Sequence, residues 1–358
     1  MLIPLQLPPG VHANGTEFES SNRWREASLV RWHDGSMRPV GGWTVRKSSA
    51  FATAPRAMIS YLDNDSDEHM AAGTYDKLYY VNPSLTVTDI TPSSGFTSGS
   101  LNGALNLGYG GGFMGSSNYG RAPTSSGVYA EATTWSLDTW GEYLLGVSST
   151  DGKLLEWQGN PSANAAVVAN APVDNLAMVV TEERFVFCLG AGGNPRKVAW
   201  SDKENNTSWT AAATNEAGDM ELQTNGQIMC GVRMRGATLI LTSEDAHLAT
   251  YSGAPFVYGF QRVGTACGIA SRKAAVAIDE GAFWMGKKGF YTFNGSTATE
   301  ISCEVADYVF DGMNPSQVSK VYAVHNSQFG EIWWFYPSDT ATENDRYVTL
   351  DYKEGHWA

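Results

Sequence analysis

The stretch TWGEYLLGVSSTDGKLLEWQG (139–159) consists of a polar start, an apolar strand, a turn and a second strand that carries an aromatic residue. Segments of the same design follow it at 180–202, 235–253, 279–295 and 327–357, and a weaker copy precedes it at 59–82. Apolar runs of strand length that are divided by polar turns indicate β-hairpins. The repetition of this stretch therefore predicts an all-β fold built from similar hairpins.

The spacing of the repeat predicts a β-propeller. The centres of the first apolar strands lie near Leu144, Val186, Leu239, Phe283 and Trp333, which are 42, 53, 44 and 50 residues apart. One four-stranded propeller blade spans about 40–50 residues, so six copies predict about six blades. A two-layer sandwich would also account for the strands, but not for the recurrence of similar hairpins over 300 residues.

The composition agrees with a turn-rich β protein and limits the classes of function. The chain has 358 residues, with 38 Gly, 12 Trp and 16 Tyr, and only 17% of it is charged. Its net charge is −13, whereas tight binding of nucleic acid requires Lys and Arg against the phosphates. There is no apolar run of about 18 residues, which predicts no membrane span. The apolar start MLIPLQLPPG lacks the basic leader of a signal peptide.

The charge divides the chain into two parts. Residues 1–47 carry six basic and four acidic residues, a balance of +2, so the remaining 18 basic and 33 acidic residues give −15. We expect an N-terminal arm with an edge hairpin at 1–47 and a β-propeller at 48–358. The last residues, DYKEGHWA (351–358), resemble part of a blade strand. Either the last blade is cut short there, or an N-terminal strand completes it and closes the ring.

The arm contains a strong hairpin signal, VRWHDGSMRPVGGW (30–43). Asp34-Gly35 lies between two strand-like runs, and these residues tolerate the positive φ angles of a two-residue hairpin turn. Alternation places Trp32 on one face and Arg31 on the other. Pro39 cannot donate to a strand ladder, which predicts an edge position. The apolar face of such a hairpin needs cover, either from the propeller or from a partner chain.

A long insertion, rich in Gly, Ser, Asn and Tyr, occupies residues 93–127. It has no Gly-Lys-Ser/Thr motif and so does not resemble a phosphate-binding loop. Loops of this length are uncommon unless they are functional or disordered. Gly and Tyr give adaptable contacts, so the insertion is either a flexible loop or a segment that packs on a neighbouring subunit.

The sequence shows no metal or cofactor site. None of the six histidines forms an HxH or HxxxH pair, so a zinc site would have to be assembled by tertiary contacts. DNDSDE (63–68) resembles the start of a calcium loop, but Glu68 and Thr74 occupy the positions that require Gly and Glu, which favours a hairpin tip. The four cysteines, at 188, 230, 267 and 303, form no CxxC motif and are interpreted as buried free thiols.

No catalytic motif is present either, and we predict that the protein is not an enzyme. SDKENNTSW (201–209) is similar to the Asp-box of sialidase-like propellers, with Asp202 one place early and Asn205 in the position of Gly. An Asp-box is a turn element, and glycosidases need two placed carboxylates or a Tyr nucleophile. No GxSxG motif occurs. Five tryptophans are either blade core or platforms for sugar rings: Trp200, Trp209, Trp284, Trp333 and Trp334.

Several short motifs resemble, in order, a family of phage virion tail proteins. They are NRWREASLVRWHDGSMRPVGGW (22–43), GYGGGFMGSSNYG (108–120), TWSLDTWGEYLL (134–145), ERFVFCLGA (183–191), VAWSDKENNTSW (198–209), GTACGIAS (264–271) and EIWWFYP (331–337). The resemblance covers nearly the whole chain, and none of the motifs is catalytic. The chain is similar to the β-propeller tail nozzle, or tail tubular, proteins of short-tailed phages.

The resemblance implies a ring of subunits, expected to be a hexamer, in the virion tail, assembled in the host cytoplasm. Its partners would be adaptor and portal-proximal tail proteins, tail fibres, and genomic DNA that passes through the lumen without tight binding, because an acidic wall repels phosphates. Trp and Arg are enriched at interface hot spots. The candidate interface residues are Arg23, Trp24, Arg31, Trp32, Arg38, Trp43, Tyr109 and Tyr119. The alternatives are a carbohydrate- or receptor-binding propeller at the tail tip and a non-viral propeller scaffold.

Overall fold

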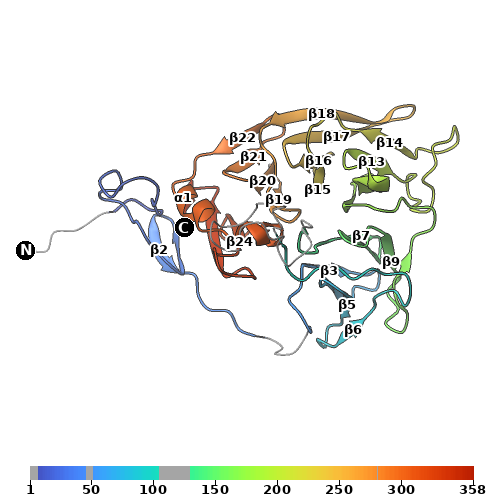
Figure 1. The fold of residues 1–358 in the computed structure, drawn as a ribbon, viewed down its shortest axis with the longest axis horizontal. Helices are drawn as coiled ribbons and strands as arrows, with labels where there is room; N and C mark the ends of the chain where they lie inside the picture. Colours follow the sequence, from blue (N-terminus) through green and yellow to red (C-terminus); the bar gives the residue numbers. More distant parts are fainter. Residues whose placement is uncertain (1–6, 46–50, 105–129, 280) are drawn as a thin grey trace, which may run out of the picture.

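The computed structural model describes residues 7–45, 51–104, 130–279 and 281–358. Within these residues, six four-stranded antiparallel sheets are arranged around a central axis (Figure 1). This is a six-bladed β-propeller and confirms the predicted fold class.

Each blade is formed by four consecutive strands. Blade 1 contains β3 (Ala57–Leu62), β4 (Glu68–Gly73), β5 (Leu78–Val81) and β6 (Val87–Asp89), and blade 2 contains β7 (Trp135–Trp140), β8 (Tyr143–Ser148), β9 (Leu154–Trp157) and β10 (Ala166–Val167). Blade 3 contains β11 (Ala177–Val180), β12 (Val186–Leu189), β13 (Lys197–Trp200) and β14 (Gly218–Glu221), and blade 4 contains β15 (Ile228–Met234), β16 (Ala237–Thr242), β17 (Asp245–Gly253) and β18 (Val257–Thr265). Blade 5 contains β19 (Ala275–Ile278), β20 (Gly281–Met285), β21 (Phe290–Phe293) and β22 (Ala298–Ile301), and blade 6 contains β23 (Tyr322–Asn326), β24 (Glu331–Tyr336), β25 (Arg346–Asp351) and β26 (His356–Trp357).

The first strand of each blade is the innermost one. β7 lies beside β3 and β11, β15 lies beside β11 and β19, and β19 lies beside β23. The apolar centres predicted as first strands therefore belong to the second strands, since Leu144 lies in β8 and Trp333 in β24. A second strand is covered by both neighbouring blades and reads as a continuous apolar run, which explains why it dominates the sequence signal.

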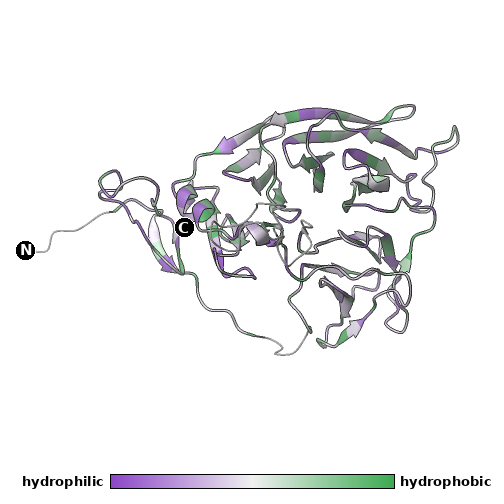
Figure 2. Cartoon of the chain, in the orientation of Figure 1, coloured by the Kyte–Doolittle hydropathy of each residue, from purple (hydrophilic) through white to green (hydrophobic). Residues whose placement is uncertain are grey.

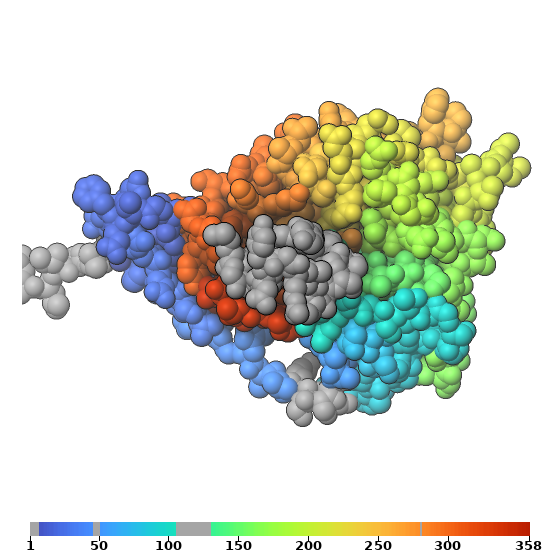
Figure 3. Space-filling model, viewed as in Figure 1, coloured from blue at the N-terminus to red at the C-terminus, as the bar shows by residue number. Residues whose placement is uncertain are grey.

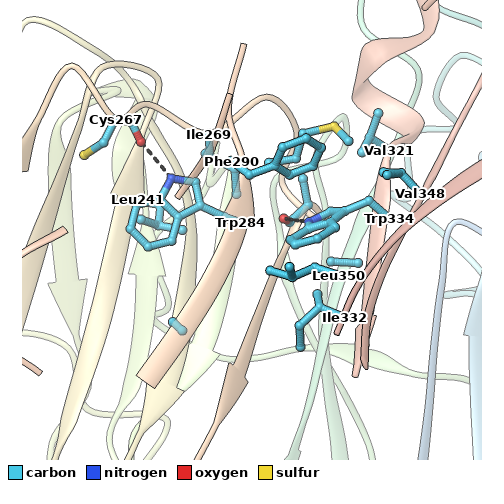
Figure 4. Packing of buried hydrophobic residues seen from close by; sticks show 14 of the residues in the cluster. Leu241, Cys267, Ile269, Trp284, Phe290, Val321, Ile332, Trp334, Val348 and Leu350 are labelled. Atoms are coloured by element: carbon cyan, nitrogen blue, oxygen red, sulfur yellow. Dashed lines mark hydrogen bonds between the residues drawn. The ribbon is translucent and has the colours of Figure 1, made fainter. Parts of the chain in front are cut away.

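The core consists of the faces that adjacent blades press together, and Figure 2 shows hydrophobic residues along the strands of the blades. Figure 4 shows the largest cluster, in which Trp284 and Trp334 are fully buried. Each indole nitrogen donates to a backbone oxygen, Trp284 to Cys267 at 2.7 Å and Trp334 to Ala274 at 3.1 Å. These bonds satisfy the polar atom of a large side chain that is otherwise buried among apolar groups.

All four cysteines are free thiols, as predicted, although Cys303 is only half-buried whereas the other three are buried. Burial raises the pKa of Cys230 to about 12 and that of Cys267 to about 11. A thiol reacts as its thiolate, so these groups are suited to packing.

The ring is closed by polar contacts between blade 6 and blade 1. Apolar clusters join blades 1–2, 2–3, 3–4 and 4–6, and within the described residues none joins blade 6 to blade 1. Instead, the Arg56 guanidinium donates to both oxygens of Glu343 at 2.6 and 2.8 Å, and Lys320 donates to the same carboxylate at 3.1 Å. We call Arg56, Lys320 and Glu343 the seam.

Among the described residues, which begin at Leu7, no N-terminal strand joins blade 6, contrary to one of the two explanations considered for its end. β26 is the fourth strand of the blade, and the backbone of Val11 donates a hydrogen bond to the oxygen of Trp357 at 2.8 Å. The described helices are the 3₁₀ turns η1 (Ala191–Gly193) and η2 (Pro315–Lys320) and the six-residue α1 (Ala306–Asp311). None of them is long and apolar enough to cross a membrane.

The predicted arm hairpin is present as a separate two-stranded sheet of β1 (Val30–His33) and β2 (Ser36–Pro39). Asp34 and Gly35 have φ angles of 52° and 66°, as the type I′ turn requires at both positions.

Gly35→Ala is expected to lower the free energy of unfolding by about 1 kcal/mol, because a Cβ is disfavoured at positive φ. No heavy atom lies within 4 Å of the position that the new Cβ would take, so the cost is conformational. Urea unfolding measures it. Gly42→Ala is the control, because a Cβ at Gly42 would also have no heavy atom within 4 Å, whereas the φ angle of Gly42 is not positive. Equal stabilities of the two variants would contradict the prediction.

Candidate assembly interface

The N-terminal arm lies against the outside of blade 6 (Figures 1 and 3). Besides the bond from Val11 to Trp357, the backbone of Ala13 donates to the oxygen of Glu304 at 2.8 Å. Trp32 is 5% exposed and belongs to the core cluster of blades 4–6, and Trp24 packs against that cluster. The arm is thus an extension of the propeller core.

A buried ion pair anchors the hairpin to β24. The Arg31 and Glu331 side chains are 10% and 4% exposed, with Arg31 Nε 2.8 Å from Glu331 Oε1 and Nη2 3.1 Å from Oε2. The guanidinium also stacks on the Phe329 ring, with 3.7 Å between Cζ and the ring centroid. Glu331 Oε2 accepts further hydrogen bonds from the side chains of Asn326 and Trp333. The charge of each partner is therefore compensated inside the fold.

The predicted interface residues fall into three groups. Arg23, Trp24, Arg31 and Trp32 face the chain's own propeller, with Arg23 paired to Glu304. Arg38 and Trp43 are exposed. Tyr109 and Tyr119 lie outside the described residues.

The arm also exposes large apolar side chains. Phe18 is 88% and Trp43 80% exposed, and Leu29, Met37 and Val45 are exposed as well. We call these five residues the exposed apolar set of the arm. All five lie within residues 18–45, and exposed apolar patches are typical of interaction sites. The sequence did not single out Phe18, because it stands alone in a polar run.

Leu101 and Asn102, which belong to the insertion, are held by the seam. The backbone oxygen of Leu101 accepts from Arg56 at 3.0 Å, and Asn102 Oδ1 accepts from Lys320 at 2.7 Å. The Gln317 amide exchanges two hydrogen bonds with the backbone of Gly103. Ala104 and Ala130 bond to each other across the base of the insertion. No sequence signal marks Asn102 and Gly103, because Lys320 and Gln317, which hold them, are more than 200 positions away.

In the part of the chain that the structure describes, tertiary contacts bring together one group of side chains that could hold a metal. The ligand atoms of His33, Asp34 and Glu354 lie within 4.8 Å of one another at the surface. Glu354 Oε1 already accepts the backbone N–H of Asp34 at 2.9 Å, so this carboxylate also positions the hairpin turn. By contrast, DNDSDE (63–68) is a turn between β3 and β4 in which Asp63 Oδ1 accepts two backbone N–H groups.

The tryptophans considered as sugar platforms are mostly blade core. Trp200, Trp284, Trp333 and Trp334 are buried. Trp209 is half-buried and donates to the backbone oxygen of Asn206 at 2.6 Å, within the Asp-box-like turn between β13 and β14. These rings serve packing and turn geometry, and the four buried ones offer no face to a sugar.

No model of a protein family matches the chain, and no curated protein matches its sequence. The chain is similar to virginiamycin B lyase from Staphylococcus aureus, with 7% identity, coverage of 88% of this chain and 84% of that one, and a TM-score of 0.45. It is also similar to BBS1N in complex with ARL6DN, with 13% identity, coverage of 86% of this chain and 81% of that one, and a TM-score of 0.45. A third similar structure is YCF48 bound to D1 peptide, with 11% identity, coverage of 71% of this chain and 66% of that one, and a TM-score of 0.38. These three proteins are not phage tail proteins, and at such identities the similarities concern the fold alone.

Proposed function

We propose that the chain is a structural subunit without catalytic activity, and that it assembles through its arm into a ring, expected to be a hexamer. The observation that carries this proposal is the arm itself, which is tied to blade 6 by the buried pair of Arg31 and Glu331 while it exposes Phe18 and Trp43. An arm that is held rigidly on its own propeller and exposes apolar side chains is suited to bind a neighbouring subunit, because little conformational entropy is lost on binding.

Within the same proposal, the ring is the nozzle of a phage tail, through which genomic DNA is retained and ejected. This part is supported by the ordered motifs of the sequence. It is also supported by the net charge of −13, because a conduit should let the duplex slide and an acidic wall does not hold phosphates.

The proposed neighbour of the arm is a second copy of the chain, as a ring of identical subunits requires. The formal charges are +2 for the arm and −15 for the remainder, but Arg23 and Arg31 are already paired with Glu304 and Glu331 of the same chain, so the exposed apolar set, and not charge, would supply the contact. The buried thiols and core tryptophans supply no reactive or sugar-binding group, which favours a structural role over a carbohydrate-binding one.

Mass photometry and electron microscopy of the full chain test the assembly. A closed ring supports the proposal, and a monomer at all micromolar concentrations, alone and with tail extracts, overturns it in favour of a non-viral scaffold. Filter binding to duplex DNA at physiological salt tests the conduit, because tight binding would overturn that part.

Trp43→Ala is expected to raise the dissociation constant of ring assembly about tenfold, because an exposed aromatic side chain at an interface contributes more than 1 kcal/mol to binding. Sedimentation velocity over a concentration series measures the constant. Phe256→Ala is the control, an aromatic that is equally exposed (81%) on the β17–β18 turn. An unchanged constant for Trp43→Ala, or the same change in the control, would contradict the role of the arm.

A further inference from the structure

A cavity of about 400 Å³ lies beside the seam. Four of its lining residues lie at the start of an innermost strand or within two positions before it: Arg56 before β3, Thr134 before β7, Lys273 before β19, and Tyr322 at the start of β23. Because the blades repeat the same strand order, the starts of the innermost strands gather at one end of the central axis. The cavity is thus built by four different blades.

The cavity is cationic in an acidic protein. Arg56, Lys273 and Lys320 line it together with one carboxylate, Glu343, a local balance of +2 against the net −13 of the chain. The side chains of Arg56 and Lys320 are 5% and 1% exposed. Charges at this depth are costly unless hydrogen bonds and counter-charges compensate them.

The compensation is incomplete. Lys320 uses its donors on Asn102, Thr342 and Glu343. Within the described residues, however, no ion pair or hydrogen bond is formed by the ammonium of Lys273, a half-buried residue that lines the cavity. In the same part of the chain, Thr134 Oγ1 and Arg56 Nε are buried polar atoms for which the structure shows no hydrogen-bond partner. Buried donors are nearly always paired in folded proteins.

The surroundings of Lys273 agree with a missing counter-charge. Burial lowers the pKa of Lys273, and the charges of Cys230 and Asp138 oppose this shift without cancelling it. An anion beside the ammonium would provide the compensation that the described side chains do not.

The rest of the cavity wall indicates which other chemical groups the ligand contains. Pro55, Met58 and Phe335 line the cavity with apolar surface. A ligand that fits both sides has one oxyanion group and a compact apolar body. We propose that this cavity binds a small organic anion whose carboxylate or phosphate group is held by Lys273 and Thr134 and whose apolar part contacts Phe335.

Isothermal titration calorimetry of the full chain tests the proposal with three probes, benzoate, phenyl phosphate and inorganic phosphate, at constant ionic strength set by chloride. We expect saturable binding of benzoate or phenyl phosphate. Lys273→Met should weaken it at least tenfold, because a charge-assisted hydrogen bond is lost, and Thr134→Val should weaken it several-fold. Lys287→Met is the matched control and should bind as the wild type does, because Lys287 is exposed and pairs with Glu244.

Preference for benzoate or for phenyl phosphate supports the site and identifies its oxyanion. Three results overturn the proposal: no binding of any probe, unchanged binding by both Lys273→Met and Thr134→Val, or inorganic phosphate binding as tightly as phenyl phosphate. Circular dichroism of each variant before titration confirms that it is folded, and Thr134→Val provides the test if Lys273→Met does not fold.

Discussion

Glu331→Ala is expected to lower the free energy of unfolding by about 3 to 5 kcal/mol, the usual cost of leaving one member of a buried ion pair uncompensated. The Arg31 guanidinium is only 10% exposed and would lose both contacts to the carboxylate, while the indole N–H of Trp333 would lose its acceptor. Guanidinium unfolding followed by tryptophan fluorescence measures the loss.

The same substitution should release the arm before the propeller unfolds. Hydrogen exchange of β1 amides is expected to accelerate more than that of β16, which lies in blade 4. Glu204→Ala is the control, because Glu204 forms an exposed pair with Arg184 and such pairs contribute about 1 kcal/mol or less. A loss in Glu331→Ala no larger than in this control would show that the arm is not anchored by the ion pair.

Glu343→Gln is expected to lower the free energy of unfolding by about 2 kcal/mol, because Arg56 and Lys320 would face each other without a counter-charge. The effect is smaller than at Glu331, since the Glu343 side chain is 44% exposed and solvent screens its charge. Hydrogen exchange should increase chiefly in β3 and β23, the innermost strands of the two blades that the seam joins.

The seam should also make stability depend on pH. Burial alone would raise the pKa of Glu343, but hydrogen bonds from Arg56 and Lys320 outweigh it and lower the pKa below the ordinary 4.5. A carboxyl whose pKa is lower in the folded state stabilises the fold above its unfolded pKa, and this contribution disappears as the pH falls toward the folded value. The wild type should therefore lose its advantage over Glu343→Gln below about pH 4.5. A constant difference between pH 7 and pH 3.5 would contradict this.

The sequence predicted the features that depend on local pattern. Repeated apolar runs predicted six blades, and Asp34-Gly35 predicted the type I′ turn, because both signals lie within a few residues. The position of the runs within each blade was assigned one strand too early. The innermost strand β23 (Tyr322–Asn326) is partly polar along the axis, whereas β24 is buried between blades, so the second strand gave the clearer signal.

The contacts that build the candidate site could not be predicted from the sequence. Arg31 and Glu331 are 300 positions apart, and no local sequence pattern near either residue predicts that they pair. The sequence identified the arm as rich in Trp and Arg but could not separate the side chains that face the propeller from Trp43, which faces solvent. That division depends on which face of the hairpin meets blade 6.

The polar junction between the first and last blades has a consequence for the order of folding. The other junctions join blades that follow one another in the chain, so each can form soon after its two blades exist. Arg56 and Glu343 are 287 positions apart, and bringing such distant residues together has the largest entropy cost of any blade contact. We therefore expect this junction to form after the junctions between consecutive blades, and its rate should respond to ionic strength, because an ion pair joins the two ends.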